Sequence, residues 1–193
     1  MVYPVNRIGK SSGAAVDPSP TLDDPLQHLV ACHDRIEERL QILERVIPHL
    51  RSDSAPKRQE AREALDNALQ FLEAMGQLHT QDEEESVFPR VLANSRNEDP
   101  TLMELMAMLE GQHRDKEGVL ANLVAQVKGF PPAPAPPAAE QASRVEGLIE
   151  QLTSLYRPHI MIENQRLIPL SADYLKPSDL EQIRQEMRSR RDL

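Results

Sequence analysis

Apolar side chains recur along the first part of this chain at alternating steps of three and four residues. The stripe runs through Leu26, Leu29, His33, Ile36, Leu40, Leu43 and Ile47. This spacing places its members on one face of an α-helix, as in the seam of a helix bundle. Asp24 and Pro25 come just before it and are typical of a helix start, because aspartate caps free N–H groups and proline suits the first turn. The pattern predicts a long amphipathic helix over residues 25–47.

Three further stripes of this kind predict three more long helices, over residues 55–88, 100–128 and 140–168. We expect the second helix to end or kink before Pro89 and the fourth to stop at Pro169, because proline lacks an N–H group and crowds the preceding turn. A short helix should follow Ser178, since Ser178 and Glu181 match a capping box. The predicted fold class is all-α, an up-down-up-down four-helix bundle with a short extra C-terminal helix.

The chain divides into three predicted parts. Residues 1–22 are rich in proline, serine and glycine and lack hydrophobic periodicity, which predicts a mobile N-terminal arm. Residues 23–170 contain the four long stripes and form the predicted bundle domain. Residues 171–193 form a C-terminal tail that carries the short helix.

Composition and charge narrow the function classes. The formal net charge of −9 argues against nucleic-acid binding, which requires a basic face for the phosphates. We expect the one basic cluster, Arg188, Arg190 and Arg191, to be a solvated helix end. The single cysteine, Cys32, cannot form an internal disulfide, and no apolar run is long enough to span a membrane. A cytoplasmic protein without membrane or nucleic-acid partners is therefore expected.

Four histidines carry the strongest chemical signal. Each lies on the apolar stripe of its own predicted helix and has a glutamate four residues later, so that the two side chains share one helix face. The pairs are His33 and Glu37, His79 and Glu83, His113 and Glu117, and His159 and Glu163. The second two pairs repeat the first two at an offset of 80 residues, which predicts a duplicated helical hairpin with pseudo-twofold symmetry.

A single histidine on an apolar stripe is usually a hydrogen-bonded core residue. Four imidazoles and several carboxylates buried together need a cationic partner, because buried charges must be paired or neutralised. The donors include no thiolate, which disfavours a structural zinc site and suits iron, manganese or zinc held by nitrogen and oxygen. More than four donors around one axis exceed a single tetrahedral ion, so the pattern favours two metal ions. We expect Glu37 to be a solvated residue at the edge of the stripe.

Two segments of the chain resemble the haemerythrin-like, or HHE cation-binding, family. They are HTQDEEESVFP from His79 to Pro89 and HIMIENQRLIP from His159 to Pro169. Together with His33 and His113 they extend the resemblance over about residues 22–170. Ferritin-like di-iron proteins instead place glutamate three residues before histidine, the opposite order.

The resemblance implies a four-helix bundle with a non-haem di-iron centre that binds or reacts with O2. Carried onto this chain, it implies terminal ligands on each of the four helices and two bridging carboxylates. The terminal ligands are His33, His79, His113 and His159, and the bridges are Glu83 and Glu163. Oxygen carriers of the family have a second histidine where this chain has Glu117, which we expect as a further ligand. This departure disfavours simple O2 carriage.

The expected cofactor is a pair of non-haem iron ions with an oxo or hydroxo bridge, with manganese or zinc as alternatives in the isolated protein. The expected ligand is O2, nitric oxide or peroxide, and the expected role is sensing, scavenging or iron handling. Two alternatives stay open, a catalytic di-iron protein for peroxide reduction or iron-centre repair, and an iron-dependent interaction module. A protein partner or homodimer is compatible with each, and no catalytic residue is assigned.

Overall fold

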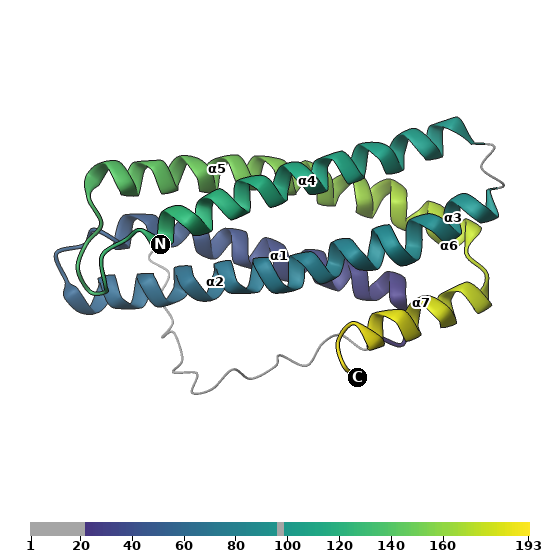
Figure 1. Ribbon diagram of the computed structural model, residues 1–193, viewed down its shortest axis with the longest axis horizontal. Helices are drawn as coiled ribbons and strands as arrows, with labels where there is room; N and C mark the ends of the chain where they lie inside the picture. The colour runs from purple at the N-terminus through teal and green to yellow at the C-terminus, as the bar shows by residue number, and fades with distance from the viewer. Residues whose placement is uncertain (1–21, 96–98) are drawn as a thin grey trace, which may run out of the picture.

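The computed structural model describes residues 22–95 and 99–193, so the predicted arm 1–22 lies outside the described residues except for Leu22. Four long helices pack side by side, as Figure 1 shows: α1 (Pro25–Val46), α2 (Ala55–Gln81), α4 (Pro100–Lys128) and α5 (Ala139–Ile162). Around the bundle α1 contacts α2, α2 contacts α4, α4 contacts α5 and α5 contacts α1. The predicted up-down-up-down four-helix bundle is confirmed.

The helix starts follow the capping residues in the sequence. The Asp24 carboxylate accepts hydrogen bonds from the N–H groups of Leu26 and Gln27 at 3.0 and 3.1 Å, so α1 begins at Pro25. Asp99 caps α4 in the same way, through the N–H groups of Thr101 and Leu102. Each cap satisfies backbone donors that have no partner within the helix.

The helical chain continues through Pro89 and Pro169, the two prolines at which we expected a long helix to end or kink. α2 passes into a π-helical segment, η2 (Asp82–Val87), and then into α3 (Phe88–Asn94). α5 passes likewise into η3 (Glu163–Leu167) and α6 (Ile168–Tyr174). The predicted stop at Pro169 is therefore wrong. The physical reason is that proline is tolerated in the first turn of the new helix, where its missing N–H group is not needed.

The short C-terminal helix is α7 (Pro177–Ser189), and a 3-10 turn, η1 (Ile47–His49), follows α1. α7 begins two residues before the position that the predicted cap at Ser178 implied, and the Asp179 carboxylate instead accepts from the Lys176 N–H at 2.9 Å. α7 packs against α1 and η2.

In the basic cluster at the C-terminus, Arg188 is exposed as expected, but Arg190 and Arg191 are not solvated. Arg190 and Arg191 donate to the buried carboxylate of Asp82 at 2.9 and 2.6 Å. The Arg191 side chain is only 6% exposed. The prediction failed because a carboxylate 109 residues away compensates the cost of burying this guanidinium.

Two apolar clusters fill the bundle, one on each side of a polar layer. One contains Leu40, Leu65, Leu123 and Leu152, and the other contains Leu29, Val91, Leu109 and Leu167. Along every long helix, the histidine of the predicted site falls between residues of the two clusters. The core therefore holds the polar layer in place from both sides.

Candidate metal centre

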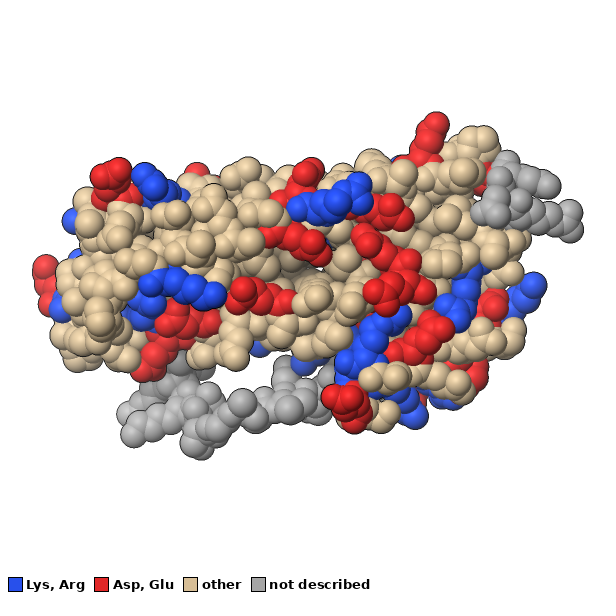
Figure 2. All heavy atoms as spheres, in the orientation of Figure 1, with Lys and Arg blue, Asp and Glu red and all other residues tan. Residues whose placement is uncertain are grey.

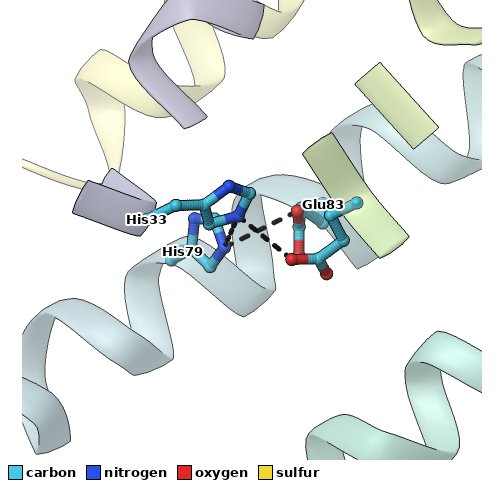
Figure 3. Close-up of side chains that lie close together, drawn as sticks. His33, His79 and Glu83 are labelled. Atoms are coloured by element: carbon cyan, nitrogen blue, oxygen red, sulfur yellow. Dashed lines mark hydrogen bonds and ion pairs between the residues drawn. The ribbon is translucent and has the colours of Figure 1, made fainter. Parts of the chain in front are cut away.

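Six of the predicted site residues meet in the polar layer of the core. They are His33 on α1, His79 on α2, Glu83 on η2, His113 on α4, His159 on α5 and Glu163 on η3. All six are at most 3% exposed. Figure 3 shows the imidazoles of His33 and His79 turned toward the carboxylate of Glu83.

The six residues form two groups of four donors, and the donor atoms within each group lie within 4.8 Å of one another. One group contains His33 and His79, and the other contains His113 and His159. Glu83 and Glu163 belong to both. Two carboxylates shared by two donor groups could bridge two cations.

In the first group, the Nε2 atoms of His33 and His79 are 3.0 Å apart. The Oε2 atom of Glu163 lies 3.0 Å from Nε2 of His33, and the Oε1 atom of Glu83 lies 3.6 Å from Nε2 of His79. The two rings meet edge to face, with centroids 4.7 Å apart.

The second group repeats this arrangement. Nε2 of His113 lies 3.3 Å from Oε2 of Glu83 and 3.5 Å from Oε1 of Glu163, which itself is 2.6 Å from Nε2 of His159. The two rings again meet edge to face, with centroids 4.7 Å apart. The 80-residue repeat in the sequence therefore corresponds to a repeat in the geometry of the site.

Two residues directly after the shared glutamates orient histidine rings from the opposite half of the chain. Nδ1 of His113 lies 2.6 Å from the Glu84 carboxylate, and Nδ1 of His33 lies 2.7 Å from the Asn164 amide oxygen. Glu84 and Asn164 are also related by the 80-residue offset. Such contacts fix the ring so that Nε2 faces the centre, and a carboxylate makes the imidazole a stronger donor than an amide does.

The other two histidines differ in their second contact. Nδ1 of His159 lies 2.8 Å from the Gln112 amide oxygen. The position equivalent to Gln112 in the first half is Cys32, and Nδ1 of His79 is buried without a hydrogen-bond partner among the described residues. The two donor groups are therefore alike in their inner atoms and unlike in what surrounds them.

The ionisable groups of the site interact strongly with one another. Burial raises the pKa of Glu83 to about 7, and the nearby Glu163 carboxylate adds to this effect. Burial also acts on Glu163, but contacts with His113, His159 and His33 hold its pKa well below the ordinary value. Burial lowers the pKa of His113, but Glu163 and Glu83 outweigh it and raise the pKa to about 10.

The site has the donor chemistry that a divalent cation requires. Both carboxylate oxygens of Glu83 and of Glu163 are buried without a hydrogen bond, as are Nε2 of His113 and of His159. Their ion-pair contacts are with other donors of the same cluster, and gathering several buried polar atoms in this way is costly without a further partner such as a cation. Imidazole nitrogen and carboxylate oxygen suit iron, manganese or zinc, and the residues present fit two such ions.

Glu117 and Glu37 do not join this cluster. Glu117 is exposed, and the buried residue beside it on α4 is Lys116, which the sequence did not single out. Glu37 lies at the surface, where its carboxylate is 3.0 Å from the Arg157 guanidinium. The structure thus brings together six of the seven predicted ligands and leaves Glu117 outside.

Four residues around the donors were missed: Glu84, Asn164, Gln112 and Lys116. Each of them stands next to a predicted ligand in the sequence, and the offset that relates His33 to His113 also relates Glu84 to Asn164. That repeat was the available signal. For Glu84 and Asn164 the signal was easily overlooked, because adjacent residues point in different directions on a regular α-helix. These two residues lie instead in the π-helical segments η2 and η3.

The fold and the buried donors define a cation-binding helical bundle. A family model described as the hemerythrin HHE cation binding domain matches residues 24–171. The chain therefore belongs to the hemerythrin HHE family, as its sequence motifs indicated. A comparison with curated proteins gives no match. In the described part of the chain, no helix has the length and apolar character needed to cross a membrane.

Proposed function

We propose that this protein holds two non-haem iron ions in the polar layer and uses them to bind or react with O2, nitric oxide or peroxide. His33 and His79 would hold one ion, His113 and His159 the other, and Glu83 and Glu163 would bridge them. One observation carries the proposal: two buried groups of imidazole and carboxylate donors share both carboxylates.

The donor count leaves room for an external ligand. Each group supplies two imidazoles and two carboxylate oxygens, four protein donors for an ion that accepts about six in octahedral geometry. Two divalent ions carry four positive charges and two glutamates cancel two of them, so a bridging hydroxide and one external anion would complete neutrality. With Glu117 outside the cluster, the protein itself does not supply the third negative charge.

Iron in such a site supplies one-electron redox chemistry and open coordination positions for small oxygen- or nitrogen-containing molecules. The chain supplies the environment. Glu84 holds His113, Asn164 holds His33, and Gln112 holds His159, each through Nδ1. The two apolar clusters restrict water around the donors. These features support sensing, scavenging or iron handling, and a reducing compartment such as the cytoplasm would suit both ferrous iron and the free thiol of Cys32.

Anaerobic loading with ferrous iron followed by exposure to O2 tests the reactivity. We expect the optical spectrum to develop the near-ultraviolet bands of an oxygen-bridged ferric pair, and nitric oxide to give a distinct spectrum. Iron-loaded protein whose spectrum is unchanged by O2, by nitric oxide and by peroxide would contradict the proposed function.

A matched pair of variants separates the site from the surface. Glu163→Gln removes one shared carboxylate with little change in size and should lose at least one of the two ions. Glu37→Gln changes the glutamate that Arg157 pairs with at the surface, and should keep both ions and the same spectrum. Equal metal loss in the two variants would count against the assigned bridges.

A further inference from the structure

A pocket of about 280 Å³ opens between α2 and α4 beside the polar layer. Residues of both helices and Tyr156 of α5 line it, and His113 is the one residue of the six-donor cluster in its wall. Figure 2 shows a hollow between these two helices, with acidic side chains around it. One water occupies roughly 30 Å³ in the liquid, so the pocket has room for more than a diatomic molecule.

The inner wall of the pocket carries a buried cation. Lys116 is 4% exposed, and its ammonium nitrogen lies 4.7 Å from the centre of the Tyr156 ring. Within the described residues, the ammonium has neither an ion pair nor a hydrogen bond. Burial lowers the pKa of Lys116 to about 8, even though the carboxylates of Glu163 and Glu83 act in the opposite direction.

Metal binding would remove that compensation. In the metal-free protein, the carboxylates of Glu163 and Glu83 act most strongly on Lys116, and those of Glu117 and Glu84 add to them. Once both carboxylates bind divalent ions, their attraction for the ammonium is offset, because two ions bring four positive charges and the two glutamates cancel only two. Lys116 then needs a new negative partner, and the pocket is the place where one can enter.

The two sides of the pseudo-twofold axis differ in residues at the position of this pocket. Gly76 in the pocket wall corresponds to Tyr156 in the second half, and a Cβ atom at Gly76 would lie 3.4 Å from the Tyr156 hydroxyl. On the opposite side of the bundle, Arg157 connects Glu37 and Glu44 at 3.0 Å each. Its counterpart beside the pocket is the uncharged Gln77.

Charge and size limit the occupant. Two exposed carboxylates in the pocket wall, Glu73 and Glu117, repel polyanions at the entrance. Lys116 in the interior favours a single negative charge, and its apolar neighbours Leu72 and Leu120 accept a short hydrocarbon part. These features fit a small monovalent anion better than a neutral or multiply charged molecule.

We propose that this pocket binds a small monovalent anion of the carboxylate type, held by the Lys116 ammonium next to the metal ion of His113 and His159. The inference rests on the proposed metal centre for the positive charge of that ion. The anion supplies the negative charge that the cluster lacks when Glu117 stays outside it. Lys116 would therefore select which external ligands reach the centre.

Calorimetric titration of the full chain loaded with zinc tests the proposal without redox chemistry. The probes are sodium acetate and acetamide in chloride-free buffer, because the two have the same shape and differ in charge. We expect acetate to bind once per chain and acetamide about tenfold more weakly or not at all. The same titration on metal-free protein should show weaker acetate binding.

Two lysine variants assign the contact. Lys116→Met keeps the length of the side chain and removes its charge, and should weaken acetate binding about tenfold. Lys128→Met changes an exposed lysine on the same helix and should leave acetate binding unchanged. Zinc content measured on each sample should stay at two ions per chain, since neither lysine is a donor in the cluster.

Acetate that binds Lys116→Met as tightly as it binds the wild type coordinates zinc alone and overturns the proposal. Equal affinities for acetate and acetamide would do the same. If the wild-type chain does not take up zinc, the metal centre itself fails. Acetate binding to the metal-free chain then still decides the role of Lys116: dependence on Lys116 supports the pocket, and its absence refutes it.

Discussion

The contact between α7 and the segment that carries Glu83 leads to a sharp stability prediction. Asp82 is fully buried and accepts from Arg190 at 2.9 Å and from Arg191 at 2.6 and 3.2 Å. Asp82→Ala removes these contacts and leaves the Arg191 guanidinium, 6% exposed, without its carboxylate. Removing one partner of a buried ion pair costs about 3–5 kcal/mol, because the remaining charge stays desolvated.

Urea denaturation of the metal-free protein measures this effect as a loss of unfolding free energy in that range. Arg188→Met serves as the control, since Arg188 is 48% exposed and its nearest carboxylate, Asp23, is 3.7 Å away. An exposed pair contributes up to about 1 kcal/mol, so the control should change little. The double variant Asp82→Ala with Arg191→Met should recover part of the loss. An Asp82→Ala variant no less stable than the Arg188→Met control would refute the reasoning.

Two further predictions concern titrating groups in the metal-free chain. Because the pKa of His113 is about 10 and that of Glu83 about 7, zinc binding should release a proton from His113 at pH 8 and an additional one from Glu83 at pH 6. The affinity for zinc should therefore rise with pH. An indicator dye in weak buffer detects the released protons, and zinc uptake that does not depend on pH would contradict this prediction. Lys116→Met should stabilise the metal-free chain by roughly 3 kcal/mol at pH 7, because burial lowers the folded-state pKa of Lys116 to about 8, below the ordinary lysine value of 10.5. This gain should shrink as pH rises from 8 to 10.5, where the ammonium no longer has to be buried as a cation, and a variant less stable than the wild type at pH 7 would exclude it.

The sequence predicted the fold and six donors because both depend on local spacing. The caps at Asp24 and Asp99 and the stripes at steps of three and four determine where helices begin and which face they bury. A histidine on such a stripe must face the core. The shared glutamates, Glu83 and Glu163, lie on that same face one turn further along their helices.

The structure leaves Glu117 outside the cluster, and the direction of its helix is the reason. A step of four residues along the chain leads toward one apolar cluster in α2 and α5 and toward the other in α1 and α4. α2 and α5 run from the cluster of Leu65 toward the cluster of Val91, so their glutamates reach the layer between the clusters. α1 and α4 run the other way, and a residue four positions after His113 has already passed the layer. The inward position there belongs to Lys116, three residues after the histidine.

The remaining features depend on contacts between distant segments. In sequence, Asp82 belongs to an acidic run and Arg191 to a basic tail, both typical of a solvated surface. Only the docking of α7 onto η2 brings them together. The pocket likewise depends on Gly76 facing Tyr156 across the bundle, a pairing that neither helix reveals alone.

Metal content and metal position in one crystal test the central claim most directly. Anomalous diffraction from the iron-loaded chain should show two ions between the four long helices, one beside His33 and His79 and the other beside His113 and His159, with Glu83 and Glu163 contacting both. Elemental analysis of the same sample should give two iron ions per chain. A single ion, or an ion bound by Glu117 in place of a bridging glutamate, would contradict the account.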